Sequence, residues 1–197
     1  MRVWSCSIVL YFILLQAYAS CEILRGFLGS IKELHDPMQL TVVFSDILEG
    51  LDPELCVKAN CLGYSDTEIN QTVTVMQENM SQNEQGWSWA FIGRNSKLLR
   101  QLSRKFFAQQ GMVFVPLDEM QVIADKLRLD NNVVFYTIDT AYDRVNLIEV
   151  YTINNEHPIK KELGFWNYMD GLKITKEGIW DRRSDLMGVI LKNLVKR

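Results

Sequence analysis

The 197-residue chain carries a net charge of −3, and its 48% hydrophobic and 23% charged residues are typical of a globular protein. It shows no clustered basic face, so nothing points to a nucleic-acid partner. Beyond its N-terminal region no apolar run approaches the length of a membrane span, about 20 residues. We therefore expect no transmembrane segment after the N-terminal region.

The N-terminus has the three parts of a secretory signal peptide. Met1-Arg2 supplies a positive start, an apolar run extends from Ile8 to Leu15, and Ala17-Tyr18-Ala19 fits an A-x-A cleavage site. We predict cleavage after Ala19, with residues 1–19 as the signal peptide; an uncleaved anchor or a buried helix is the alternative. Export would place the rest, enough for one domain, in an oxidising compartment.

Three cysteines remain after this cleavage. Cys56 and Cys61 are close enough in sequence to form a local disulfide, and Cys21 can pair with either of them or stay free. Their spacing fits neither a C-x-x-C redox site nor a zinc site, and neither His35 nor His157 has metal-ligating neighbours. We expect a structural disulfide, no metal ion and no cofactor.

Two sequons for N-linked glycosylation lie close together in a polar segment. They are Asn70-Gln71-Thr72 and Asn79-Met80-Ser81. Behind a signal peptide, two such sites predict glycans on Asn70 and Asn79. They place residues 64–86 on an exposed surface.

The first half of the mature chain predicts one helix and one strand. Helical spacing over residues 21–35 is shown by Ile23, Leu24, Phe27, Leu28, Ile31 and Leu34. Asp36-Pro37 ends that helix, and the β-branched run at 40–44 predicts a strand. Residues 51–62 fit a short helix or a loop, and residues 66–80 fit a strand or a helix.

From residue 87 onward, strands and helices alternate. Strands are predicted at 87–92, 112–115, 133–138 and 145–153, and turns at 130–132 and 139–144. A helix capped by Asn95 or Ser96 should run to Gly111 on an apolar stripe of Leu98, Leu99, Leu102, Phe106 and Phe107. A second helix should start after Pro116, with an inner face of Met120, Ile123, Ala124 and Leu127. Trp87 and Trp89 share one side of the first strand and are expected in the core.

This alternation predicts a single α/β domain. Its sheet should be largely parallel and flanked by helices, with the last two strands forming an antiparallel hairpin at one edge. The sequence after Asn154-Asn155 reads as an irregular packed connector, with Gly164, Gly171 and Gly178 spaced by seven. We place the domain at residues 20–175, and a linker leading into a further strand at 176–197.

A search for catalytic chemistry finds little. The chain has no nucleophile elbow, metalloprotease, P-loop or dinucleotide-binding motif. Asp139 and Asp143 flank a turn at a strand end, where α/β folds bind ligands, but acids in turns mostly cap the backbone. The basic cluster of Arg100, Arg104 and Lys105 reads as a solvated helix face. We expect a protein that is not an enzyme.

Arg182-Arg183 is the remaining pair of interest. Two planar guanidinium groups can clamp an external carboxylate. They can equally hold the connector against acids of their own domain. The structural role is the favoured interpretation.

The order of these features resembles the insect ionotropic receptors, the chemosensory relatives of ionotropic glutamate receptors. A signal peptide precedes a divergent α/β region with paired strands at 133–136 and 145–151, followed by Leu163-Gly164-Phe165-Trp166 and Gly171-Leu172. The stretch from Trp180 to Gly188 then resembles the family's W-x-R-R-x-D/N-L-x-G junction, where the first strand of the ligand-binding domain starts. Its matching residues are Trp180, Arg182, Arg183, Asp185 and Gly188. Length and cysteine content are most similar to the acid-sensing seventy-five subfamily.

The resemblance implies the extracellular N-terminal domain of a ligand-gated cation channel, with a role in folding, trafficking or subunit assembly. Its partners would be receptor subunits or co-receptor ectodomains. The ligand-binding domain and pore would follow residue 197, so we expect a truncated form, to which no agonist-contacting residue can be transferred. It would lie on the extracellular side of the plasma membrane within a full-length receptor, or be secreted alone.

Two other interpretations stay open. One is a free-standing secreted α/β module that binds a small molecule. The other is a secreted hydrolase, which is the least favoured because no nucleophile, metal set or cofactor loop is recognisable.

Overall fold

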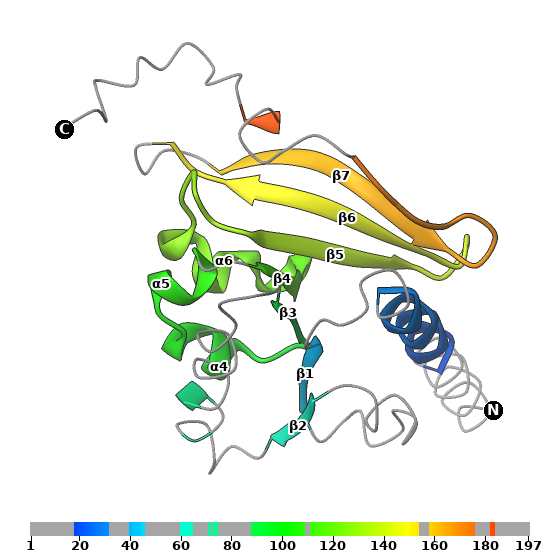
Figure 1. Cartoon of the computed structure of the whole chain (residues 1–197), viewed down its shortest axis with the longest axis horizontal. Helices are drawn as coiled ribbons and strands as arrows, with labels where there is room; N and C mark the ends of the chain where they lie inside the picture. Colours follow the sequence, from blue (N-terminus) through cyan, green and yellow to red (C-terminus); the bar gives the residue numbers. More distant parts are fainter. Residues whose placement is uncertain are drawn as a thin grey trace, which may run out of the picture.

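The computed structural model describes residues 18–31, 40–45, 60–64, 71, 73–74, 88–108, 111–153, 158–175 and 182–183. Within these residues, eight strands form one sheet in the order β2-β1-β3-β4-β5-β6-β7-β8 (Figure 1). The strands are β1 Leu40–Ser45, β2 Asn60–Tyr64, β3 Ser88–Ile92, β4 Gly111–Pro116, β5 Val133–Asp139, β6 Arg144–Tyr151, β7 Ile159–Asn167 and β8 Gly171–Ile174. A helix covers 18–31, and the other helices are α4 Ser96–Gln101, α5 Arg104–Phe107, η2 Leu117–Glu119, α6 Met120–Ile123 and η3 Ala124–Lys126.

The sheet is mixed, which corrects one part of the predicted fold. Strands β2, β1, β3, β4 and β5 pair in parallel, whereas β5, β6, β7 and β8 pair antiparallel. The α/β class and the antiparallel pairing of β5 with β6 are confirmed. The predicted largely parallel sheet with one hairpin at its edge is wrong, because the hairpin continues into β7 and β8.

Residues 159–167 and 171–174 are therefore strands and not part of the irregular connector that the sequence indicated. Gly164 lies at an irregularity of the sheet, since the pairing of β6 with β7 shifts register between Leu147 and Ile148. Gly164 has φ +154, and a Cβ there would collide with the carbonyl of Lys173 in β8. Glycine at this irregularity lets β8 approach β7 closely. Gly171, with φ +67, starts β8 just after the turn at 168–170.

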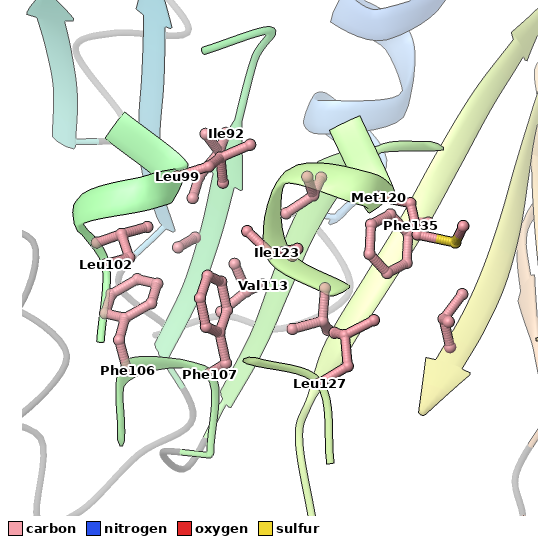
Figure 2. Packing of buried hydrophobic residues seen from close by; sticks show 14 of the residues in the cluster. Ile92, Leu99, Leu102, Phe106, Phe107, Val113, Met120, Ile123, Leu127 and Phe135 are labelled. Carbon is pink, nitrogen blue, oxygen red and sulfur yellow. The ribbon is translucent and has the colours of Figure 1, made fainter. Parts of the chain in front are cut away.

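One face of the sheet is covered by α4, α5 and α6. Their apolar side chains meet every second residue of β3, β4 and β5 and form a buried cluster. Figure 2 shows the rings of Phe106, Phe107 and Phe135 in this cluster, with Ile123 and Leu127 beside them. All five are at most 1% exposed.

The opposite face is covered by the helix at 18–31, which Figure 1 shows on the other side of β3 and β4 from α4 to α6. Its buried residues are Ile23, Leu24, Phe27, Leu28 and Ile31, as the helical spacing predicted. Phe27 packs edge-on against Phe114 of β4, with ring centroids 5.7 Å apart. The indole nitrogen of Trp166 in β7 donates a hydrogen bond of 2.7 Å to Ser30 Oγ, which ties this helix to the antiparallel strands.

The helix predicted from residue 95 to Gly111 is two short helices. Asn95 caps α4 as expected, since its side chain accepts a hydrogen bond of 2.9 Å from Leu98 N. The chain is extended at Leu102, and Ser103 caps α5 through Phe106 N. All five predicted stripe residues are buried. Gly111 does not end a helix but begins β4.

Other observed elements differ from the prediction in their bounds or type. Residues 60–64 form β2, although the sequence indicated a helix or loop up to residue 62. Residues 71 and 73–74 are helical, where a strand or helix was left open. The side chains of Leu34, Trp87 and Trp89 lie outside what the structure describes.

Candidate functional site

Glu149 is a charged side chain in an inward-facing row of β6. It follows Val145 and Leu147 at two-residue spacing, and both of these are fully buried. Glu149 itself is only 2% exposed. A carboxylate in such a row is costly unless it is paired and hydrogen-bonded.

Both arginines of the 182–183 segment bind this carboxylate. Arg182 donates from Nε to Glu149 Oε2 at 3.2 Å and from Nη2 to Oε1 at 2.9 Å. Arg183 donates to Oε1 from Nε at 3.0 Å and from Nη2 at 2.7 Å. The guanidinium of Arg182 thus spans both oxygens, the two-point geometry in which arginine binds carboxylates most strongly.

Arg183 is the more deeply placed of the two, at 2% exposure. It also donates to the backbone carbonyls of Leu129 and, at 2.9 Å, Asn131. Its guanidinium carbon lies 4.8 Å from the ring centroid of Tyr151 in β6. Arg183 is therefore shared among a charge, two carbonyls and an aromatic face, contacts that offset the loss of its hydration.

The turn that offers these carbonyls is held in place by the buried side chain of Asn131. Asn131 Oδ1 accepts from Val133 N at 3.0 Å, and its Nδ2 donates to the carbonyl of Val150 at 3.3 Å. On the other side of the cluster, Lys161 Nζ donates to the carbonyl of Arg182. Residues 182–183 are thus bound through their side chains to the turn before β5 and to β6, and through the backbone carbonyl of Arg182 to β7.

The charges of this cluster favour the ionised carboxylate. Burial alone would raise the pKa of Glu149, but the hydrogen bonds and positive charges of Arg182 and Arg183 outweigh it and lower that pKa. Burial also lowers the pKa of Arg183, and the charge of Glu149 opposes that change. Because arginine is the most basic side chain, Arg183 stays charged at neutral pH despite this lowered pKa.

A second cluster lies at the carboxyl ends of the parallel strands. Arg94 and Ser96 follow β3, and Asp118 and Glu119 follow β4. Ser96 Oγ donates to the buried Glu119 Oε2 at 2.6 Å, and Arg94 pairs with Asp118 at 2.6 Å. Burial raises the pKa of Tyr136 in β5, and the negative charges of Asp118 and Glu119 add to the rise. Open α/β sheets commonly bind ligands at this edge.

Several predicted site residues lie outside the described part of the chain. They are the sequon asparagines Asn70 and Asn79, Cys56, and the junction residues Trp180, Asp185 and Gly188. The structure brings together only Arg182 and Arg183 of the junction motif. Of the two roles considered for this pair, the contacts with Glu149 correspond to the one within the same chain.

Two of the three cysteines lie in described elements, Cys21 in the helix at 18–31 and Cys61 in β2. Cys21 is a free thiol in the structure. The pairing of Cys56 with Cys61 stays a prediction, because Cys56 lies outside the described residues.

Asp139 and Asp143 occupy the β5–β6 turn. Asp139 Oδ1 accepts from Ala141 N at 3.1 Å, and Asp143 takes a left-handed backbone with φ 45. Both features are those of turn residues. The basic cluster of Arg100, Arg104 and Lys105 is exposed on α4 and α5, as predicted.

Sequence reasoning missed Glu149 and Asn131. A signal for Glu149 exists: the alternation of Val145, Leu147 and Tyr151 leaves a glutamate on the inward side of the strand. No comparable signal marks Asn131, because asparagine is common in turns whether or not it is buried.

Comparison with models of known protein families, with curated proteins and with solved structures finds no match. Over the described ranges, no helix is long and apolar enough to cross a membrane. The same part of the chain contains no group of three or more histidine, cysteine or acidic side chains that could hold a metal ion.

Proposed function

We propose that this chain is a non-catalytic extracellular domain of the chemosensory ionotropic receptor type, acting in folding, trafficking or subunit assembly. The sequence supports this by its export signal, its two sequons and its junction-like segment. Its partners would be receptor subunits or a co-receptor ectodomain. The proposed location is the secretory pathway and the extracellular side of the plasma membrane.

The observation that carries this proposal is the ion pairing of both junction arginines with Glu149. Arg183 is buried and fully engaged, so it is not free to bind an external carboxylate as a receptor ligand. Lys161 holds the backbone at the same point. A segment fixed in this way gives a defined orientation to whatever the domain is joined to, as an assembly domain requires.

Expression of the tagged chain in insect cells tests the proposal. We expect protein in the medium with a glycosidase-sensitive mass increase, which the control variant N70Q/N79Q lacks. We also expect the secreted protein to bind a purified ionotropic co-receptor ectodomain on a biosensor. Unglycosylated protein retained in the cytosol would contradict the proposal.

The cluster at the carboxyl ends of β3 and β4 favours one alternative, a secreted module that binds a small molecule. It combines Arg94, the acids Asp118 and Glu119, and the phenol of Tyr136 at the edge where α/β sheets hold ligands. Titration calorimetry with small acids and amines separates the two proposals. Saturable heat that R94A abolishes would favour the module, and a flat titration removes it.

A further inference from the structure

Four large hydrophobic side chains of the described residues are exposed: Tyr18, Tyr142, Tyr168 and Met169, each at least 57% exposed. Three of the four lie in two turns at one end of the sheet. Tyr142 lies in the β5–β6 turn, and Tyr168 and Met169 lie in the β7–β8 turn. Scattered exposed hydrophobics are ordinary, but their concentration at one place marks an interaction surface.

The two turns are neighbours. Arg144 at the start of β6 pairs with Asn167 at the end of β7, and Figure 1 shows both turns at the same end of the antiparallel strands. Tyr168 Oη donates to the carbonyl of Glu22 at 2.8 Å, so the helix at 18–31 borders them. We define the turn surface as Tyr142, Asp143, Tyr168, Met169 and Asp170. Tyr18 is left out because the predicted cleavage would remove it.

The second of these turns is held by its own side chains. The ring of Tyr168 packs on buried Trp166, with centroids 4.7 Å apart. Asn167 and Asp170 exchange two hydrogen bonds of 2.6 and 2.9 Å across the turn. Ordering the backbone of this turn on binding therefore costs little conformational entropy.

The turn surface is acidic as well as aromatic. Residues 140–143 and 168–170 contain Asp143 and Asp170 and no basic residue. The nearest base in sequence, Arg144, lies 3.9 Å over the ring of Phe165 and pairs with Glu162. Arg25 of the bordering helix acts on Tyr168 through its charge, and it pairs with Glu22 at 3.8 Å. Two copies of the surface would face each other with like charges, and an anionic membrane would repel it. Tyrosine faces beside carboxylates suit ammonium and guanidinium groups.

We propose that the turn surface is a docking site for a partner protein that presents arginine or lysine side chains. The inference rests on the proposed role in subunit assembly, since it assigns that role to a surface. Met169 and Tyr142 supply apolar contact area, and Asp143 and Asp170 supply the charge that selects a basic partner.

The test uses the secreted, isotope-labelled chain and a capped peptide of alternating glycine and arginine as the probe. We expect salt-sensitive NMR shifts at the turn surface. The variant D143N/D170N should weaken binding about fivefold, since each exposed ion pair contributes only modestly to affinity. Asparagine tolerates the left-handed backbone at position 143, so the turn is kept. The matched control D125N/D130N removes two exposed acids elsewhere and should change affinity less than about twofold.

Several results would overturn this inference. One is a set of NMR shifts that lie outside the turn surface, and another is an equal loss of peptide affinity in D143N/D170N and in the control variant. The others are preference for a capped glycine–glutamate peptide, self-association of the chain through the same residues, and attachment to vesicles that contain phosphatidylserine. The variant Y142S/M169S, with both changes at exposed positions, should also weaken peptide binding. Binding of the peptide without binding of the co-receptor ectodomain would refute the proposed function but would still support the turn surface as a docking site.

Discussion

At Glu149, two guanidinium groups share one carboxylate inside an otherwise apolar row. Such an arrangement is weak evidence for stability as a whole, because desolvating the charges costs about as much as their attraction returns. The arrangement matters most for substitutions of a single residue in the cluster. Removing the carboxylate leaves Arg183 charged, buried and without its counter-ion, so we expect Glu149 to tolerate substitution poorly.

The lowered pKa of Glu149 predicts a pH dependence of stability. A carboxyl group whose pKa is lower folded than unfolded stabilises the fold above its unfolded pKa, 4.5, and loses that contribution as the pH falls through its folded pKa. We expect the urea midpoint of wild type to fall more steeply than that of E149Q as the pH is lowered below 4.5. Parallel curves for the two proteins would show that Glu149 is not ionised in the cluster.

At the scale of elements, most of the core strands could be predicted from the sequence. The runs at 133–138 and 145–153 are rich in β-branched and aromatic residues, and the structure places β5 and β6 there. The apolar spacing of residues 21–35 likewise predicted the buried face of the helix at 18–31. In these segments local preference and tertiary packing agree.

The strands β7 and β8 escaped prediction for a physical reason. Residues Lys160, Lys161 and Glu162 are all exposed, and the irregularity at Gly164 then interrupts the two-residue alternation. A strand without a regular alternation of apolar and polar side chains, and with a glycine inside it, has the sequence pattern of a loop. The break between α4 and α5 is similar, since the apolar stripe continues across it and only the extended backbone at Leu102 separates the helices.

Two glycines of the helix at 18–31 make a matched test of its packing. A Cβ at Gly26 would lie 2.5 Å from the buried ring of Trp166, whereas a Cβ at Gly29 would have no heavy atom within 4 Å. We expect G26A to destabilise the fold by about 1–3 kcal/mol through overpacking, although alanine favours helix. G29A should stabilise it by about 0.5–1 kcal/mol. Urea denaturation measures both, and equal shifts would mean that this helix does not pack on Trp166.

At the scale of the whole molecule, the sequence indicated an α/β domain but not its two-part sheet. Local patterns mark strands, whereas the order and direction of pairing depend on contacts between distant segments. The same limit applies to the candidate site. Arg182 and Arg183 stood out in the sequence, but their partner Glu149 is more than thirty residues away and only the fold brings them together.

The seating of residues 182–183 connects three parts of the molecule. Glu149 belongs to β6, the acceptor carbonyls of Leu129 and Asn131 belong to the turn before β5, and Lys161 belongs to β7. Loss of the central charge pair would release this segment from all three. The proposed assembly role depends on this attachment, because an unattached segment would not orient a neighbouring domain.

Whether Glu149 holds this segment is tested most directly by a double-mutant cycle of E149L and R183M, measured by urea denaturation. E149L should cost about 3–5 kcal/mol because it leaves Arg183 charged and buried without its counter-ion. R183M should cost less because Arg182 still pairs with Glu149, and the double variant should lose clearly less than the sum of the two single losses. The exposed pair Arg94 and Asp118 is the control, and R94Q with D118N should couple by less than about 1 kcal/mol. Additive losses at Glu149 and Arg183, within about 0.5 kcal/mol, would contradict the seated arrangement.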